Sequence, residues 1–396
     1  MDTTALDLQA LTAASLIVTA TGNVSDSGTL AITGATTIDA GTGNITLDEA
    51  ASTFGALALT GANVAVTENA AMELAASTIS GTASFDSTDN AITDSGTLAI
   101  TGATTIDAGT ADITLDEAAS TFGSLALTGA NVAVTENDAT ELAASTVSGT
   151  FDITSGGAIT NSGALAITGV STFTNTDGTN EAITLNNTAN TFTGNVSFTT
   201  DTGSDVTITD NSDFGIQSGL NVNNLSITST GSVTDLGDID IDGTLTVSAA
   251  GQTIDLSGTG NDLSGAVTLT GAAVTLQDTT ATAIAGITAT GDLSVTSGGA
   301  ITQTGAIDAD LASSFTAGAN AITLTNASND FSGAVSLSNS GTNDAALTDV
   351  NALDLGTVTV GQNLTVIASG VISDSGVVTV AGTSSLDNAG GTNAAI

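Results

Sequence analysis

One segment of the sequence occurs twice. The segment from Asp26 to Gly81 and the segment from Asp94 to Gly149 begin about 70 residues apart. They differ at six of their 56 positions, which are 43, 44, 56, 70, 72 and 79 in the first copy. A fixed period of this length is typical of repeat architectures, in which a unit buries its apolar face only against its neighbours. The repeat therefore constrains the fold more than any other feature.

The same unit continues through the chain with more changes. A Phe or Leu close to a Gly marks each copy at a regular interval, at Phe54, Phe122, Phe192, Leu263 and Phe331. Residues 4–28 match residues 351–376 in pattern, and residues 389–396 resemble residues 317–322, so we expect the chain to begin and to end inside a repeat. We predict a single continuous repeat array over residues 1–396, with units of about 70 residues and about three coils each.

Short runs of alternating apolar and small polar residues fill each unit. Leu30 and Ile32 form one such run, and Ile45 and Leu47 form another. This period of two indicates strands with one face turned inward. Roughly nine runs per unit divide into three turns of three strands. The sequence therefore predicts an all-β fold, a right-handed parallel β-helix (β-solenoid) of about 17 coils with about 23 residues each.

Other secondary structure fits the sequence less well. A tandem array of small antiparallel sandwiches would need linkers and Asn-Gly or Asp-Gly hairpin turns, and these turns are scarce. The absence of Pro also favours uninterrupted strands. The stretch from Glu68 to Ala76 could form one helical turn, but its copy at 136–144 carries Asp and Thr and favours a loop or a strand.

The chain contains no Lys, Arg or His and 41 acidic residues, for a net charge of −41. Nucleic acid and anionic membranes are not expected as partners, because their binding depends on Lys and Arg. No apolar run is long enough to span a bilayer. On a rod of about 80 Å the charge density would approach that of duplex DNA. We therefore expect cations, Ca²⁺ above all, to stabilise the rod and to permit lateral contacts between rods.

The same composition limits the chemistry that the chain can perform. Without His, Cys or Lys, nucleophilic triads are excluded. Two carboxylates could hydrolyse a glycosidic bond, and the candidate pairs are Asp48 with Glu49, Asp116 with Glu117, and Asp238 with Asp240. The first pair recurs as the second, as expected for the copied turns of a stalk. We therefore interpret these pairs as solvated turn residues and predict no enzymatic activity.

Acidic residues are densest near Asp235. Asp238, Asp240 and Asp242 alternate along a strand and would share one face, with about 6.7 Å between successive carboxylates. Ca²⁺ takes six to eight oxygen ligands, which carboxylates and backbone carbonyls supply. The sequence therefore predicts a calcium site at Asp235, Asp238, Asp240 and Asp242, with calcium as the only cofactor.

Ice binding is a further alternative, because flat ladders of Thr-x-Thr pairs can face an ice lattice. Such pairs occur at five places in the chain. They fall at differing positions of the repeat, so we expect no continuous ladder. The pairs are Thr207 with Thr209, Thr244 with Thr246, Thr268 with Thr270, Thr323 with Thr325, and Thr357 with Thr359.

The amino-acid sequence of the repeats is similar to that of a known class of proteins. The strings GTLAITGATTIDAGTGNITLD, STFGALALTGANVAVTEN and SGGAITQTGAI resemble the repeats of giant bacterial surface proteins of the filamentous-haemagglutinin-like, β-strand-repeat class. This resemblance covers nearly the whole chain. It implies a secreted, extracellular β-helix stalk at the bacterial cell surface, used in adhesion, in a biofilm matrix or in filaments. It also implies self-association into filaments or bundles and contact with cell-surface or matrix glycans.

Overall fold

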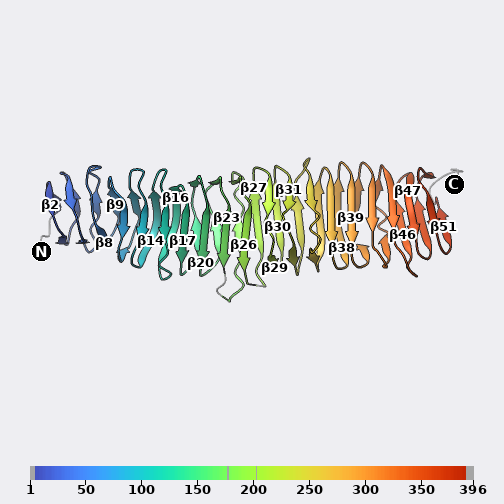
Figure 1. The fold of residues 1–396 in the computed structure, drawn as a ribbon, viewed down its shortest axis with the longest axis horizontal. Coiled ribbons are helices and arrows are strands. Elements are labelled where there is room, and N and C mark those ends of the chain that lie inside the picture. The colour runs from blue at the N-terminus through green and yellow to red at the C-terminus, as the bar shows by residue number, and fades with distance from the viewer. Residues whose placement is uncertain (1–4, 176–177, 202, 389–396) are drawn as a thin grey trace. The chain divides into compact units, whose positions relative to one another are not determined.

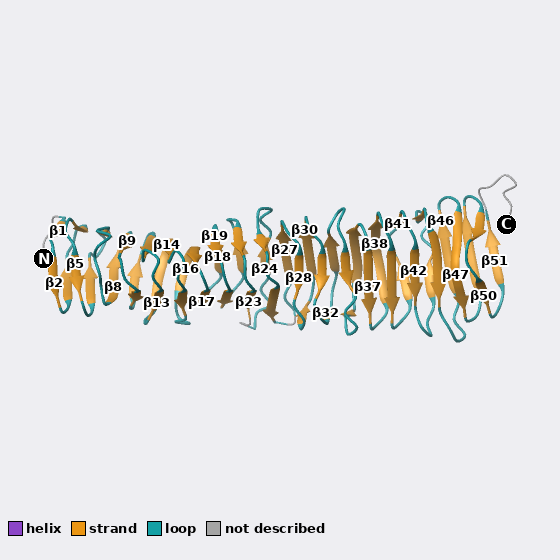
Figure 2. Ribbon diagram, turned by 45° about the horizontal axis from the view of Figure 1, so that its top comes forward, coloured by secondary structure: helices purple, strands orange, loops and turns teal. Residues whose placement is uncertain are grey.

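The computed structural model describes residues 5–175, 178–201 and 203–388. Contacts divide the chain into two compact units, Met1–Asp201 and Thr202–Ile396. Within these described residues every regular element is a β-strand, and the strands of successive turns pair in parallel (Figures 1 and 2). The predicted all-β solenoid is therefore confirmed, with about 19 turns in the described residues.

In the first unit the strands form stacks, each strand pairing with its counterpart one turn later. One stack contains β1 (Leu6–Leu8), β4 (Val24–Asp26), β7 (Ile45–Leu47), β9 (Val64–Thr67), β12 (Ala83–Asp86), β14 (Leu98–Asp107) and β16 (Thr121–Gly129). A second contains β10 (Met72–Leu74), β13 (Ile92–Asp94), β15 (Ile113–Leu115), β17 (Val132–Glu136), β20 (Phe151–Ser155), β23 (Ser171–Asn175) and β26 (Val196–Thr200). Shorter stacks contain β2 (Leu11–Ala13) and β5 (Leu30–Ile32); β3 (Leu16–Thr19), β6 (Thr36–Asp39), β8 (Ala56–Gly61) and β11 (Ser77–Ile79); β18 (Thr140–Leu142), β21 (Ile159–Asn161) and β24 (Ile183–Leu185); and β19 (Ser145–Val147), β22 (Leu165–Ile167) and β25 (Thr191–Phe192).

The second unit is built in the same way. Its longest stack contains β28 (Phe214–Ile216), β31 (Val233–Asp235), β34 (Ile254–Leu256), β37 (Val274–Asp278), β39 (Leu293–Ser297), β42 (Ser313–Thr316), β45 (Ala334–Ser338) and β47 (Leu353–Val360). The first half of β47 pairs with β49 (Ile372–Asp374) and its second half with β50 (Val378–Val380). Another contains β27 (Val206–Asp210), β30 (Leu225–Ser229), β33 (Leu245–Ser248), β36 (Ala266–Gly271) and β38 (Thr282–Ala289), which continues into β40 (Ile301–Gln303), β43 (Ile322–Leu324), β46 (Ala345–Asp349), β48 (Leu364–Ala368) and β51 (Ser384–Asp387). The remaining strands are β29 (Leu220–Val222), β32 (Ile239–Ile241) and β35 (Asp262–Leu263), together with β41 (Ile307–Ala309) and β44 (Asp330–Phe331).

The core of each unit follows directly from the period of two. In β8, Leu57 and Leu59 are fully buried and Ala58 between them is partly exposed. Because strands pair in register, an inward residue lies on an inward residue of the next turn, as Ile45 does on Val64. Each turn therefore buries its apolar side chains against its neighbours, as a solenoid requires.

Equivalent residues of successive repeats lie on different faces of the solenoid. In the first unit Ile45 belongs to the stack of β1, Ile113 to the stack of β10 and Ile183 to the stack of β18. The chain passes through these three stacks in succession at β16, β17 and β18. In the second unit Ile254 and Ile322 are displaced in the same sense, from the stack of β28 to that of β40. A repeat therefore spans three complete turns plus one of the three faces of a fourth turn.

The predicted number of coils was wrong. Partners in successive turns are close in sequence, as Leu125 is to Leu142 and Ile45 is to Val64, although the turn from Ser171 to Val196 is longer. Turns are therefore shorter on average than the predicted length of about 23 residues. A repeat contains ten strand segments, because β14 and β16 each turn a corner and contribute to two faces. Ten segments on three faces give about three and a third turns per repeat, in place of three.

The stretch that could have formed a helical turn is extended. It contains β10 (Met72–Leu74), which pairs with β13, and its copy contains β18, which pairs with β21. The preference for a strand over a helix was therefore correct.

Candidate functional site

At one position of five successive repeats, a carboxylate lies almost completely buried inside the solenoid, at the end of a strand or directly after it. These side chains are between 0 and 2 % exposed, and they occupy equivalent positions of the repeat. We call them the corner carboxylates. They are Glu68, Glu136, Asp210, Asp278 and Asp349.

The strand alternation directs these side chains inward. In β17 residues 132, 134 and 136 are buried and the two residues between them are partly exposed. Glu136 therefore occupies the position that an apolar residue would take. These carboxylates were not among the residues predicted from the sequence. The signal was present in Val64, Val66 and Glu68, where the acid continues the inward phase of the strand.

Glu136 is held by two hydrogen-bond donors. The amide of Phe122, 14 residues earlier in the chain, donates to Oε1 at 2.7 Å, and the Thr140 hydroxyl donates to Oε2 at 2.9 Å. Burial raises the pKa of Glu136 to about 7; both donors oppose this shift and the carboxylate of Asp138 adds to it. The side chain thus gives the Phe122 amide an acceptor inside the core, which a buried amide requires.

Glu68 is the equivalent residue of the first copy, and its surroundings differ. Its side chain is 0 % exposed, and neither carboxylate oxygen has a hydrogen-bond partner. Burial raises its pKa to about 8; the nearby amide of Phe54 opposes this shift without reaching hydrogen-bond geometry. The residue at the position of Thr140 is Met72, which has no hydroxyl to donate.

The corner carboxylates of the second unit show a similar range. Asp278 accepts the amide of Leu263 at 3.2 Å, both the amide and the hydroxyl of Thr280 at 2.9 and 3.0 Å, and the hydroxyl of Thr282 at 2.9 Å. Asp349 accepts the amide of Phe331 at 3.1 Å through Oδ1, whereas its Oδ2 has no partner. Burial raises the pKa of Asp349. Asp210 accepts the Ser212 hydroxyl at 2.9 Å.

A second buried polar position precedes the Phe or Leu marker of each repeat. Its side chain is fully buried and accepts an amide of the preceding turn, as Ser120 accepts the Leu98 amide at 3.0 Å. These residues hold the corners together by hydrogen bonds. They are Ser52, Ser120, Asn190, Asn261 and Asn329.

Asp235, the first residue of the predicted calcium site, belongs to this interior network. It is buried, and its Oδ2 accepts Asn261 Nδ2 at 2.7 Å and the Gly258 amide at 3.0 Å. Burial raises its pKa. The structure therefore separates Asp235 from the other three predicted ligands, because the inward phase of β31 turns its side chain into the core.

Asp238, Asp240 and Asp242 lie outside, as their alternation predicts. Ile239 and Ile241 of β32 are buried, and the three aspartates between and beside them are exposed or partly exposed. Asp238 accepts the Gly260 amide at 2.8 Å, and Asp240 accepts Asn221 Nδ2 at 2.9 Å.

Asp238 and Asp240 line a shallow groove of about 430 Å³ over β29, β32 and β35. Asp262 of β35 lies beside Asp240 in register. Burial raises the pKa of Asp240, and the carboxylates of Asp242 and Asp262 add to the shift. Within the described residues no three acidic side chains form a group that could hold a metal ion. Calcium binding in this groove stays a prediction.

The other candidate carboxylate pairs lie in turns, as interpreted. The Asp48 amide donates to Oδ1 of Asp26 at 3.0 Å, and the Asp116 amide donates to Oδ1 of Asp94 at 2.9 Å. The turns close by backbone hydrogen bonds from Ser52 to Glu49 and from Ser120 to Glu117.

The expectation that the Thr pairs form no continuous ladder was wrong in part. Thr207, Ser226, Thr246 and Thr268 pair in register across β27, β30, β33 and β36, on the outward side of the strands. A second row runs beside the first through Thr209, Thr228, Ser248 and Thr270, and Thr270 pairs with Thr288. The repeat positions differ because each repeat advances by one face, and the ladder also uses serines. Thr323 lies farther along the same stack, in register with Thr302 of β40, and Thr359 belongs to the stack of β28.

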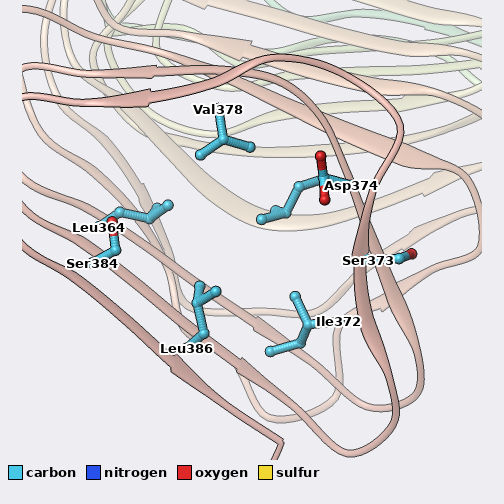
Figure 3. Close-up of a pocket in the computed structure, with 8 residues that line it drawn as sticks. Leu364, Ile372, Ser373, Asp374, Val378, Ser384 and Leu386 are labelled. Atoms are coloured by element: carbon cyan, nitrogen blue, oxygen red, sulfur yellow. The ribbon is translucent and has the colours of Figure 1, made fainter. Parts of the chain in front are cut away.

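A hollow of about 200 Å³ lies within the last turns of the second unit (Figure 3). The side chains of Leu364, Ile372 and Leu386 approach it from different strands, and Val378, which is 39 % exposed, lies at its margin. The lining contains one carboxylate, that of Asp374. The hollow is thus a partly open section of the apolar core.

A family model described as repeats of unknown function (DUF5649) matches six successive segments, residues 1–60, 61–128, 129–199, 203–270, 271–338 and 342–396. The four inner segments are each about 70 residues long, in agreement with the period found in the sequence. Searches of curated proteins and of solved structures found no match. The described part of the chain contains no helix that could cross a membrane.

Proposed function

Since the chain belongs to this family of repeats of unknown function, we propose that it is a structural, non-enzymatic segment of a secreted bacterial filament or adhesin stalk. The observation that carries the proposal is the uninterrupted stacking within each unit. In the first unit β10 to β26 form one stack over seven turns, and in the second unit β28 to β47 form one over eight. Such an array contacts only its neighbours, so its length can change while its fold stays the same. These are the properties of a spacer.

The surface chemistry supports an extracellular matrix or filament role of the kind that filamentous-haemagglutinin-like proteins have. All charged side chains are acidic, so neighbouring copies repel one another unless cations screen them. Cations, and Ca²⁺ in particular, would then control lateral association, with matrix glycans as further partners. Chelation at low ionic strength should lower the melting temperature and disperse bundles. If the chelator changed neither the melting temperature nor the bundling, the proposed role of cations would be wrong.

Deletion of one whole repeat tests the spacer role. Removing residues 26–93 joins Ser25 to Asp94, and the sequence after the junction is nearly unchanged, because residues 94–149 copy 26–81. We expect a folded protein that is shorter by about 16 Å in electron micrographs, at about 4.8 Å for each turn. Adhesion or matrix assembly should weaken in a graded way. Complete loss of adhesion or matrix assembly in a deletion variant that still folds would contradict the proposal and favour a specific site in the deleted repeat. Hydrolysis of a polysaccharide by the parent protein that the deletion abolishes would contradict it as well.

Ice binding is a second candidate, favoured by the two hydroxyl rows on β27, β30, β33 and β36. Adjacent strands are about 4.8 Å apart and alternate residues within a strand about 6.7 Å apart, which gives a flat, regular array of hydroxyl groups. A thermal-hysteresis assay tests it directly. Activity that disappears in the Thr228→Asp variant would support ice binding, and the absence of activity in the parent protein would dismiss it.

A further inference from the structure

We propose that three of the corner carboxylates, Glu68, Glu136 and Asp349, make the solenoid a pH-responsive structure, which takes up protons in its core as the pH falls and is more stable in mildly acidic than in alkaline solution. This inference goes beyond the proposed function, since it concerns folding stability and holds whatever the repeats bind.

The first step is the cost of keeping these groups ionised. The side chains are between 0 and 2 % exposed, so water cannot solvate their charge. An ionised carboxylate in apolar surroundings is costly unless it is paired or hydrogen-bonded. The chain has no Lys, Arg or His, so no side-chain cation can pair with it. Hydrogen-bond donors are the means by which the protein can stabilise the ionised form.

The second step is that the number of donors differs between repeats. Glu68 accepts no hydrogen bond, Asp349 accepts one and Glu136 accepts two. Asp278 accepts three, from the amides of Leu263 and Thr280 and the hydroxyl of Thr282, and it shares the single hydroxyl proton of Thr280 with Asp262. Donors to a carboxylate favour its ionised form. We therefore expect Glu68 to hold its proton to a higher pH than Glu136 does.

The charged groups that face Glu136 and Asp349 act in the same direction as burial and raise the pKa of these two carboxyls. Asp138 faces Glu136, and Asp330 faces Asp349, so that each ionised neighbour disfavours a second charge. Thr280 connects Asp278 to Asp262, because its hydroxyl lies 3.0 Å from the first carboxylate and 3.1 Å from the second. For Glu68, burial is the cause of the raised pKa.

The sign of the effect follows from linkage. A carboxyl whose pKa is higher in the folded state than in the unfolded state binds its proton more tightly when folded. Lowering the pH through the folded pKa therefore stabilises the fold, until the unfolded pKa is passed. For Glu68 this interval extends from about 8 down to 4.5.

Urea unfolding of the full chain tests the proposal in about 1 M NaCl, where repulsion between surface carboxylates is screened within about 3 Å. We expect the parent protein to unfold at a higher urea concentration at about pH 5 than at about pH 9. The Glu68→Gln variant should show a smaller difference between the two pH values. The matched control is Glu73→Gln, at a nearby exposed position of β10, which should keep the full difference.

A further variant separates titration from packing. Asp278→Asn replaces an acceptor of three unshared hydrogen bonds by an amide, so we expect a lower midpoint by a similar amount at both pH values. If the Glu68→Gln chain does not fold, Asp349→Asn makes the same test at a site with one donor. Equal midpoints of the parent protein at the two pH values would overturn the proposal. So would a Glu68→Gln variant that responds to pH as Glu73→Gln does.

Discussion

The first two repeats of the first unit have nearly the same sequence, but their buried glutamates differ in the hydrogen bonds that they accept. Glu68 and Glu136 are 0 and 2 % exposed, so their burial is nearly equal. Two of the six differences between the copies lie beside them, Ala70 against Asp138 and Met72 against Thr140. Thr140 donates a hydrogen bond to Glu136, and Met72 cannot donate one to Glu68. The comparison teaches that burial raises the pKa of both groups, and that local donors decide how far.

The two buried glutamates also differ in the buried hydrogen-bond donors that they satisfy. Glu136 satisfies the amide of Phe122 and the hydroxyl of Thr140 inside the core. Its removal would leave both donors without an acceptor. Glu68 satisfies nothing within hydrogen-bond distance. The first copy therefore contains a buried carboxyl without a hydrogen-bond partner, whereas the carboxyl of Glu136 in the second copy accepts hydrogen bonds from two donors at a corner of the solenoid.

The largest expected effect is the pH dependence of the parent protein. Because the pKa values of Glu68 and Glu136 are raised to about 8 and about 7, the free energy of unfolding should fall as the pH rises from about 5 to 8. Each group that titrates contributes at most about 1.4 kcal/mol for each pH unit. Urea titrations at high salt measure this slope. A slope of zero between these values would mean that both groups are ionised throughout.

Replacement of each glutamate by Met should separate the copies most clearly. Glu136→Met removes the acceptor of two buried donors and should destabilise the protein by about 1–3 kcal/mol. Glu68→Met removes an unsatisfied acid and should be neutral or stabilising at about pH 8. Unfolding free energies at that pH provide the comparison. Equal losses in the two variants would show that the donors of Glu136 contribute nothing.

Exchange of the neighbouring residue should move one copy towards the other. In Met72→Thr a hydroxyl can reach Glu68, so the pH at which stability falls should decrease by about one unit, or about 1.4 kcal/mol. Thr140→Met should shift the response of Glu136 upward. The midpoint of the pH profile is the quantity to compare. A shift of both variants in the same direction would refute the role of the hydroxyl.

The smallest effect is expected at two partly exposed turn residues, which serve as controls. Glu49 and Glu117 occupy equivalent turn positions of the two copies, and their replacement by Gln should change the free energy of unfolding by less than about 0.5 kcal/mol. The two variants should also agree with one another. A large effect of either one would indicate that charge at the surface, and not in the core, dominates the pH response.

The architecture could be predicted because the period of two within strands and the repeat of about 70 residues can both be recognised directly in the amino-acid sequence. The sequence did not predict that a repeat spans three and a third turns, since β14 and β16 each bend around a corner without a break in their pattern. The Ser and Thr rows were missed for a related reason, because register brings different repeat positions side by side. The calcium residues were grouped by proximity in the sequence, whereas the alternation of β31 turns Asp235 inward.

The protonation state of Glu68 near neutral pH tests the central claim most directly. Infrared difference spectra between the parent protein and Glu68→Gln, recorded from about pH 5 to pH 9, isolate the carbonyl band of its protonated carboxyl group. With a pKa of about 8, the band should be present at about pH 7 and should disappear only at higher pH. The corresponding band of Glu136, isolated by the same comparison with Glu136→Gln, should be half lost at about pH 7. A Glu68 carboxyl that is already ionised at about pH 6, or that titrates together with Glu136, would contradict the account.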